Sequence, residues 1–373
     1  MNVFARLLMV AIASLAMTPS LAASDLPGLP QGASVQPAEK IAPYVARFGR
    51  TRPLIVVVGE NSSTVLSDYV IPYGVLSRSG VADVFSLATK PGLLKLPPLQ
   101  IQPDNTVAQF DANFPEGADY VVVPAVMERK DATLLAWVSA QAAKGATMVS
   151  ICNGSIVLAN AGLTRGHRAT GHWSTHSSRV SAYPDTQWLK NVRYVADGRI
   201  ISSAGISAAM PTSIALVEAI AGTARAELLA KSLGVAYWGP KHDSAVFGFR
   251  FGDGASAISS SVFRSRQQIG ISVDTGVDEI AVSFLAEAYS ATMRAQVYTV
   301  GPTSAQVRTL GGLMLVPDRV AGQGKQFDLL LPASDGTPAA LVLDKAIEDI
   351  TARYGKSAAR FVVLEAEYPS PSL

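Results

Sequence analysis

The stretch VSICNGSIVLANAGLTRGHRATGHW (Val149–Trp173) contains the only cysteine of this 373-residue chain. Cys152 follows the apolar run Thr147–Ile151, typical of a buried strand, and precedes Asn153-Gly154 and a helix-like segment, Ser155–Asn160. A strand that turns sharply into a helix holds a side chain on a strained corner, where backbone N–H groups face a reacting atom. The helix N-terminus also favours a thiolate. We therefore predict that Cys152 is a nucleophile, the alternative being a small buried side chain.

The first 23 residues have the pattern of a secretory signal. Arg6 supplies the positive charge, Leu7–Met17 the apolar stretch and Ser20-Leu21-Ala22 a small-residue cleavage site. The apolar stretch is too short to span a bilayer, although a retained anchor is the alternative. We expect an exported protein, periplasmic in a bacterium, with no membrane association after cleavage. A single cysteine cannot form an internal disulfide, so the oxidising environment of an exported protein would not cross-link this chain internally.

Composition and charge argue against several classes of protein. The 31 basic residues nearly balance 29 acidic ones and are scattered, so nothing favours binding to nucleic acid. A hydrophobic content of 49% fits a compact protein, and the mature length predicts two domains. No phosphate-cradling glycine loop precedes a helix, so we expect no organic cofactor. We also expect no metal, because His167, His172 and His176 lack accompanying ligands at a useful spacing.

Apolar strands alternate with helices along the chain, which predicts an α/β fold with a mostly parallel sheet. We expect strands at residues 54–59, 81–88, 118–125, 147–151, 192–195 and 200–203, and helices at 68–79, 132–145, 155–160 and 211–220. A turn is expected at Ala196–Arg199. The chain is divided into a signal (1–23), a linker or arm (24–50), a first domain with the cysteine corner (51–235), a connector (236–264) and a second unit (265–373).

The second unit partly repeats the first. QIGISVDTGVDEIAVSFLAEAY (Gln268–Tyr289) parallels the first strand and helix, and Leu313–Ala333 parallels Leu99–Ala125. A helix, Pro338–Tyr354, follows, and RFVVLEAEY (Arg360–Tyr368) is expected to form one more strand. The repeat then stops near the point where the cysteine corner would occur. We interpret it as a truncated, catalytically empty copy that packs on the first domain as an internal pseudo-dimer. Chance similarity, and an additional homodimer, remain alternatives.

Three segments carry a resemblance to a known family. They are CNGSIVLANAGLTRGHRATGHW (Cys152–Trp173), DGRIISSAGISAAMPTSIALVEAIAG (Asp197–Gly222) and SDYVIPYGVLSRSG (Ser67–Gly80). Together, residues 53–222 resemble the ThiJ/PfpI superfamily, which is class I glutamine amidotransferase-like. Within it they resemble the amidase-like domain of AraC-type transcriptional regulators and isonitrile hydratases. The resemblance implies a flavodoxin-like three-layer αβα sandwich with a mostly parallel sheet, followed here by a second truncated copy of the same fold.

The same resemblance implies roles for particular side chains. Cys152 would be the nucleophile and Asp68 the acid beside the sulfur, able to donate a hydrogen bond to the thiolate or to shuttle protons. Asp68 could instead cap a helix, and Glu60 is the second choice for the acid. His172 would lie near the sulfur as a base or counter-charge, with a structural hydrogen-bonding role as the alternative.

One departure from the family pattern concerns the oxyanion hole. Relatives carry Pro-Gly-Gly where this chain has Pro124-Ala125-Val126, and side chains at Ala125 and Val126 restrict the loop and crowd the pocket. Asn153 still offers its backbone N–H after the cysteine. Gly205, in the turn Ser203–Ser207, is expected to line the site together with these residues.

We expect Cys152 to attack the electrophilic carbon of a small molecule, such as an amide, isonitrile or aldehyde. This predicts hydrolase, hydratase or amidase-like chemistry. The alternative is a non-enzymatic sensor or binding domain for a small ligand, which the missing Gly-Gly favours. A third reading is a redox or stress protein in which Cys152 is oxidised. Fold alone does not choose among these functions.

Overall fold

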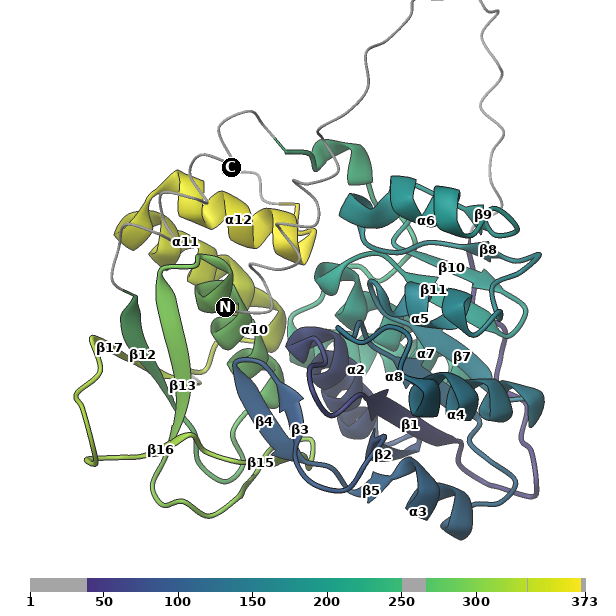
Figure 1. The fold of residues 1–373 in the computed structure, drawn as a ribbon, viewed down its shortest axis with the longest axis horizontal. Helices are drawn as coiled ribbons and strands as arrows, with labels where there is room; N and C mark the ends of the chain where they lie inside the picture. The colour runs from purple at the N-terminus through teal and green to yellow at the C-terminus, as the bar shows by residue number, and fades with distance from the viewer. Residues whose placement is uncertain (1–38, 250–265, 334, 370–373) are drawn as a thin grey trace, which may run out of the picture.

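The computed structural model describes residues 39–249, 266–333 and 335–369. Two sheets, each with its own helices, form two domains that lie side by side, shown from purple to teal and from green to yellow in Figure 1. We refer to residues 39–249 as the first domain and to residues 266–369 as the second. The predicted signal at residues 1–23 lies outside the described residues. Within the described ranges, no helix is both long and apolar enough to cross a bilayer.

The first domain is built on a seven-stranded sheet in the order β10-β11-β7-β6-β1-β2-β5. Every neighbouring pair is parallel except β10 with β11. The strands are β1 (Leu54–Gly59), β2 (Asp83–Ala88), β5 (Asn105–Thr106), β6 (Tyr120–Val123), β7 (Thr147–Ser150), β10 (Tyr194–Asp197) and β11 (Ile200–Ser203). All six residues of β1 are buried, as a parallel sheet covered on both faces requires.

Helices cover both faces of this sheet, which confirms the predicted three-layer αβα sandwich (Figure 1). Ile55 and Val57 of β1 point into the core shared with one set of helices, and Val56 and Val58 point into the other core. The first set is α2 (Leu66–Ser79), α7 (Ala209–Ala221) and α8 (Thr223–Leu233). The second set is α3 (Val107–Asn113), α4 (Ala132–Ala143) and α5 (Gly154–Asn160).

The second domain has a four-stranded parallel sheet in the order β16-β13-β12-β17. This order matches β5-β2-β1-β6 of the first sheet, strand for strand along the chain. The strands are β12 (Gln267–Ser272), β13 (Ala295–Gly301), β16 (Arg319–Val320) and β17 (Leu329–Pro332), and the helices are α10 (Glu279–Ala291), α11 (Val342–Tyr354) and α12 (Lys356–Ala366). The second domain is thus a partial domain of related topology.

A polar contact is repeated at equivalent places in the two sheets. In the first domain, Asp104 accepts hydrogen bonds from the backbone N–H and the hydroxyl of Ser86, both at 2.8 Å. In the second, Asp318 accepts the same pair of bonds from Thr299, again at 2.8 Å. The acidic residue in each case follows a hairpin and leads into the short edge strand. The two domains therefore share this side-chain contact as well as the order of their strands.

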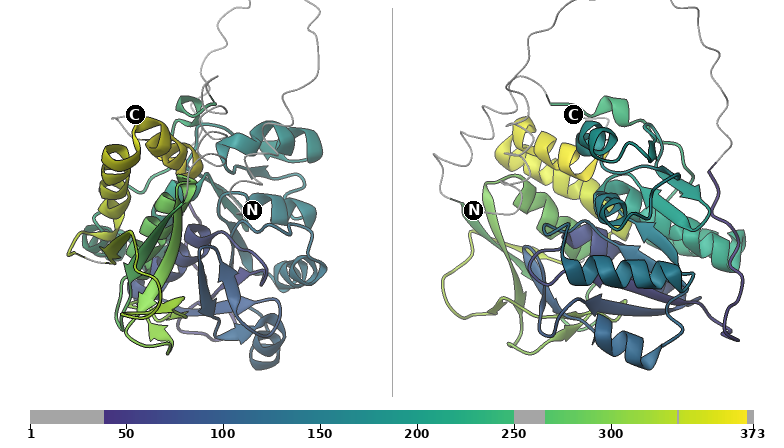
Figure 2. Two further views of the ribbon diagram at one scale, coloured as in Figure 1. Left: turned by 60° about the vertical axis from the view of Figure 1, so that its left-hand side comes forward. Right: turned by 45° about the vertical axis from the view of Figure 1, so that its right-hand side comes forward.

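The domains are joined by a third sheet to which each contributes a hairpin. β3 (Leu94–Leu96) and β4 (Leu99–Gln102) come from the first domain, and β14 (Val307–Arg308) and β15 (Met314–Leu315) come from the second. β4 pairs with β15 in an antiparallel arrangement, so the sheet runs β14-β15-β4-β3. Helices α2 and α10 pack against each other beside it, and the views of Figure 2 show the two domains meeting along this seam.

A partly buried ion-pair cluster adds to the seam. The guanidinium of Arg78, at the end of α2, donates to both carboxylate oxygens of Asp278, at 2.9 and 2.5 Å, and to Glu279 at 2.8 and 3.0 Å. Asp278 also caps α10 by accepting hydrogen bonds from two backbone N–H groups of its first turn. Charge pairing of a helix end with a helix start thus aligns α2 and α10.

Two local predictions are wrong, and several helices were not predicted. Arg360–Tyr368 is not a strand: it belongs largely to α12, because Ala358, Val362 and Ala366 recur every four residues and bury one helical face. The β-branched pair within the segment suggested a strand, but tertiary packing decides. The turn predicted at Ala196–Arg199 is shorter, since β10 continues to Asp197. Helix α8 was not predicted, although its buried residues Ala226, Leu229, Ala230 and Leu233 follow helical spacing.

Candidate functional site

Cys152 lies on the predicted corner between β7 and α5. Its φ is +55°, a left-handed conformation that costs energy for any residue other than glycine. The corner is held by a hydrogen bond from Cys152 N to the Ala204 carbonyl at 3.0 Å and by one from the Ser155 hydroxyl to the Cys152 carbonyl at 3.0 Å. A side chain on Gly154 would overlap the carbonyl group of Val123. The sharp turn therefore depends on glycine at the helix start.

Asp68 points from α2 toward this corner and is fully buried. Its Oδ2 accepts a hydrogen bond from Ala125 N at 3.1 Å. Burial raises the pKa of Asp68 to about 7, against the opposing effect of the hydrogen bond from Ala125 N and of the neighbouring Cys152 thiol. The helix-cap alternative is wrong, since α2 begins at Leu66 and its cap position is Val65. The structure thus brings the predicted acid and the cysteine together.

Cys152 itself is buried, and burial raises the pKa of its thiol. The neighbouring Asp68 charge raises it further, while the backbone N–H of Asn153 lowers it. The free site accordingly holds a thiol rather than a thiolate, next to a carboxyl group that changes protonation near neutral pH. Such a pair can exchange one proton.

His172 lines the same pocket, but both of its ring nitrogens are engaged elsewhere. Nδ1 lies 2.7 Å from the Ser174 hydroxyl and Nε2 lies 3.2 Å from the Glu365 carbonyl. Burial lowers the pKa of His172, so the ring is neutral near pH 7. Among the hydrogen bonds of the described residues, none joins this imidazole to the sulfur. Its contacts match the structural role named as the alternative.

The other predicted site residues divide into two groups. Ala125, Val126 and Asn153 line the pocket beside Cys152. However, Ala125 N donates to Asp68, so this N–H is not directed at a ligand. Glu60 does not line the pocket: its Oε2 accepts hydrogen bonds from Ser62 and Ser63 and closes its own turn. Gly205 lies just behind the pocket wall, and its N donates to Glu367 Oε2 at 2.8 Å.

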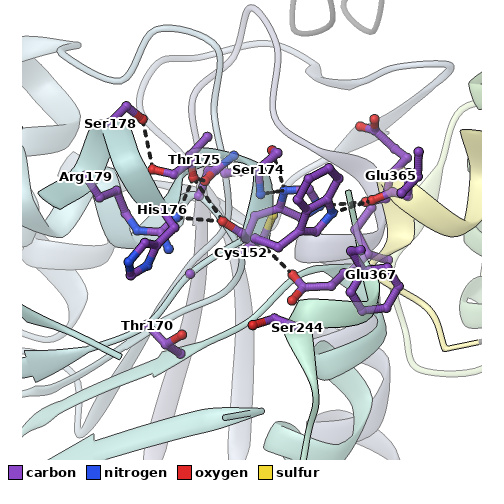
Figure 3. Close-up of a pocket in the computed structure, with 18 of the residues that line it drawn as sticks. Cys152, Thr170, Ser174, Thr175, His176, Ser178, Arg179, Ser244, Glu365 and Glu367 are labelled. Carbon is purple, nitrogen blue, oxygen red and sulfur yellow. Dashed lines mark hydrogen bonds between the residues drawn. The ribbon is translucent and has the colours of Figure 1, made fainter. Parts of the chain in front are cut away.

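The pocket has a volume of about 800 Å³ and lies where the two domains meet. Figure 3 shows Cys152 at its centre, with Arg179 and His176 on one side and Glu365 and Glu367 on the other. An aromatic wall borders it, in which the Trp173 ring lies 6.4 Å from Phe247 and 5.1 Å from Phe249 between centroids. Within the described ranges, no group of three His, Cys, Asp or Glu side chains is arranged to hold a metal ion.

Comparison with known proteins identifies the family of the first domain. The sequence model of the DJ-1/PfpI family matches residues 55–219, which include β1, the cysteine corner and most of α7. This domain belongs to the DJ-1/PfpI family.

Curated relatives of the DJ-1/PfpI domain include several kinds of protein. An isonitrile hydratase of Pseudomonas putida is 34% identical over 102 residues, or 27% of this chain and 42% of the relative. An HTH-type transcriptional regulator of Pseudomonas aeruginosa is 34% identical over 84 residues, which cover 22% of this chain and 25% of the regulator. Protein dj-1beta of Drosophila melanogaster is 27% identical over 176 residues, or 46% of this chain and 91% of the relative. The chain therefore spans less than half the length of the first two.

Solved structures with a similar fold include the same Drosophila protein, at a TM-score of 0.45 and 24% identity over 50% of this chain and all of that one. An AraC family transcriptional regulator from Pseudomonas putida has a TM-score of 0.42 at 17% identity, over 48% of this chain and 98% of that chain.

Residues outside the DJ-1/PfpI domain complete its pocket, and sequence reasoning missed them. Glu367 follows α12 and has a φ of +50°. Its carboxylate accepts hydrogen bonds from Trp173 N, Gly205 N and His242 Nε2, at 3.1, 2.8 and 2.9 Å. Glu365 contributes a carboxyl group to the pocket wall, and burial raises its pKa to about 7. The available signal was two glutamates within the otherwise apolar segment Phe361–Tyr368.

Proposed function

We propose that the protein uses Cys152 as a nucleophile toward an electrophilic carbon of a small substrate, in a hydratase, hydrolase or amidase-like reaction. The observation that carries this proposal is the strained corner: it exposes the sulfur to an 800 Å³ pocket beside a carboxyl group with a pKa of about 7. Backbone strain at a pocket wall is typical of functional sites, where the surrounding structure holds a reactive group in place. Similarity to an isonitrile hydratase agrees with this class of chemistry.

In the proposed reaction, Asp68 moves the proton. Near neutral pH a large fraction of Asp68 is ionised and accepts the thiol proton as the sulfur forms its bond to the substrate carbon. The electron pair displaced from that carbon passes to the attached nitrogen or oxygen, which takes the proton back from Asp68. Water then releases the product from sulfur. The Asn153 N–H faces the thiolate side of the corner and stabilises negative charge there.

A ligand-binding function without catalysis is the second candidate, and one observation favours it. The Ala125 N–H, at the position where an oxyanion donor is expected, donates to Asp68 instead. Similarity to an HTH-type transcriptional regulator agrees with a sensing role. In this case the aromatic wall and the buried thiol would contribute to ligand affinity and to the shape of the pocket. Cys152 would then react slowly with electrophiles.

We further propose that the protein is exported and that the second domain takes the place of a partner subunit. Export rests on the signal-like pattern of residues 1–23. The pseudo-dimer is supported by the matching strand order of the two sheets, by the shared β14-β15-β4-β3 sheet and by the packing of α2 on α10. Such an arrangement would let one chain complete a pocket that otherwise needs two.

The proposed role of Asp68 predicts the pH dependence of Cys152 alkylation by iodoacetamide, measured by intact mass. In the wild-type protein the rate should rise through pH 7, as Asp68 ionises and accepts the thiol proton. Asp68→Asn should react about tenfold more slowly at pH 7, since general-base assistance is lost. Glu60→Gln is the matched control, because Glu60 closes its own turn outside the pocket; its profile should equal that of the wild type.

The opposite sign would overturn the proposal. If Asp68 acted only as a nearby negative charge, its removal would lower the Cys152 pKa and accelerate alkylation. A thiol that does not react in either protein between pH 6 and pH 9 would favour the ligand-binding function instead.

A further inference from the structure

Two arginines stand beside Cys152 on one wall of the pocket. Arg129 lies in the loop between β6 and α4, and Arg179 lies on α6 (His176–Ala182). Arg179 is 1% exposed and Arg129 is half-buried. Both are close enough to the sulfur for a thiolate to raise the pKa of each guanidinium, whereas burial lowers it. The two guanidinium groups also repel each other.

Neither arginine has a carboxylate partner among the described residues. Arg179 donates through Nη1 to the His172 carbonyl at 2.8 Å and to the Thr175 hydroxyl, which Figure 3 shows beside it. Its Nε is buried and has no hydrogen-bond partner. The Arg129 side chain makes no hydrogen bond or ion pair with any described residue, although its backbone is fixed by a bond from Asn160 Nδ2 to the Arg129 carbonyl at 2.9 Å.

Two neighbouring cations, one buried and one half-buried, are costly unless a negative charge compensates them. The charge of Glu367, on the opposite wall, raises the pKa of Arg179, but the Glu367 carboxylate also accepts hydrogen bonds from His242, Trp173 N and Gly205 N. A neutral thiol supplies no compensating charge. An anion bound beside the two guanidinium groups would supply a counter-charge and relieve their mutual repulsion. The planar guanidinium group is suited to pairing with the two oxygens of a carboxylate.

We propose that this pocket binds a small carboxylate, held by Arg129 and Arg179, with its apolar part against the Trp173 and Phe247 wall. In terms of the proposed function, the substrate is then a carboxylate-bearing electrophile whose reactive carbon is presented to Cys152. Carboxylate binding itself does not depend on the reaction, so the two proposals can fail separately. Arg129 is the better position to test, because removing its side chain breaks no hydrogen bond or ion pair with the described residues.

The first arm of the experiment compares two alkylating reagents of nearly equal size, iodoacetate and iodoacetamide. Both react with the same thiolate, so the ratio of their rates cancels any change in the Cys152 pKa and reports recognition of the carboxylate. We expect this ratio to fall about tenfold in Arg129→Gln relative to the wild type, as expected for one lost charge pair in a partly desolvated site. Arg129→Lys should keep part of the preference for iodoacetate, since lysine retains the positive charge but lacks the planar guanidinium group that can pair with two oxygens.

The matched control for this arm is Arg165→Gln. Arg165 is exposed, lies 3.7 Å from Asp185 and does not line the pocket. Its ratio should equal that of the wild type. If Arg129→Gln slows both reagents equally, the arginines serve the thiolate alone, and the proposed carboxylate site is wrong.

The second arm measures the binding of benzoate to Cys152→Ala by titration calorimetry, which needs no reactive sulfur. We expect saturable binding that weakens about tenfold when Arg129→Gln is added. Absence of binding, or binding that is indifferent to Arg129, overturns the carboxylate site. If Cys152 proves unreactive toward both reagents while benzoate binding depends on Arg129, the nucleophile proposal fails and the carboxylate site stands.

Discussion

Gly154→Ala should lower the free energy of unfolding by about 2–4 kcal/mol. The new methyl group would overlap the Val123 carbonyl oxygen and come within 2.9 Å of its carbon and 3.0 Å of the Pro124 carbonyl carbon. These atoms are backbone of β6 and the loop that follows it, so no flexible side chain can yield. The start of α5 must therefore move away from the sheet, carrying Cys152 with it. Urea unfolding measures the loss of stability, and Cys152 alkylation reports the displaced corner.

Gly248→Ala is the matched control for this prediction. An added Cβ at Gly248 meets no atom within 4 Å, so its free energy of unfolding should stay within about 0.5 kcal/mol of the wild type. Equal stability of the two variants would mean that β6 and α5 adjust to the extra carbon, and that the corner is not held by close packing.

Glu287→Gln should stabilise the protein at pH 9 and have little effect at pH 5. Glu287 lies on α10 of the second domain, is buried, and accepts a hydrogen bond from Ser67 N at 3.1 Å through Oε2. Burial, together with the charges of Asp68 and Glu365, raises its pKa to about 8. Glutamine keeps an oxygen acceptor for Ser67 N but never ionises. The variant thus removes the cost of a buried charge without removing the contact.

The direction with pH follows from the raised pKa. An unfolded glutamate ionises near pH 4.3, whereas folded Glu287 stays protonated to about pH 8, so its contribution to stability is complete below pH 4 and is lost as pH rises to 8. At pH 9 we expect the variant to exceed the wild type by about 2–4 kcal/mol in urea unfolding. Exposed Glu348→Gln on α11 serves as the control. A Glu287→Gln difference that is the same at pH 5 and pH 9 would contradict the buried-acid description.

Sequence patterns of short range predicted the first domain well. The unbroken apolar runs of β1 and β6 indicate strands buried on both faces, and their alternation with helices leaves few topologies. The cysteine corner could also be predicted, because strand, Asn153-Gly154 and helix follow one another within a few residues. Pairing of Asp68 with Cys152 came from the family resemblance rather than from spacing, since the two are 84 positions apart in sequence.

The part of the site that could not be predicted from the sequence depends on contacts between distant segments. Glu367 reaches the pocket only because α12 packs against α10 and the chain then turns through a left-handed residue. Arg129 and Arg179 lie on loops and a short helix whose local sequence carries no periodic signal. The strand predicted at Arg360–Tyr368 also hid this part of the site, because Glu365 lies in α12 and Glu367 directly follows that helix.

The sheet shared between the domains has a consequence for how this protein can vary. In an assembly of two identical chains, every substitution near the two-fold axis is imposed twice, often on residues that face each other. Across β4 and β15 the facing residues differ: Gln102 is opposite Met314, and Ile101 is opposite Leu315. A change in one hairpin therefore leaves the other untouched. The two domains of this single chain can therefore accumulate different mutations. The first domain supplies the cysteine of the pocket, and the second supplies Glu365 and Glu367 of its wall.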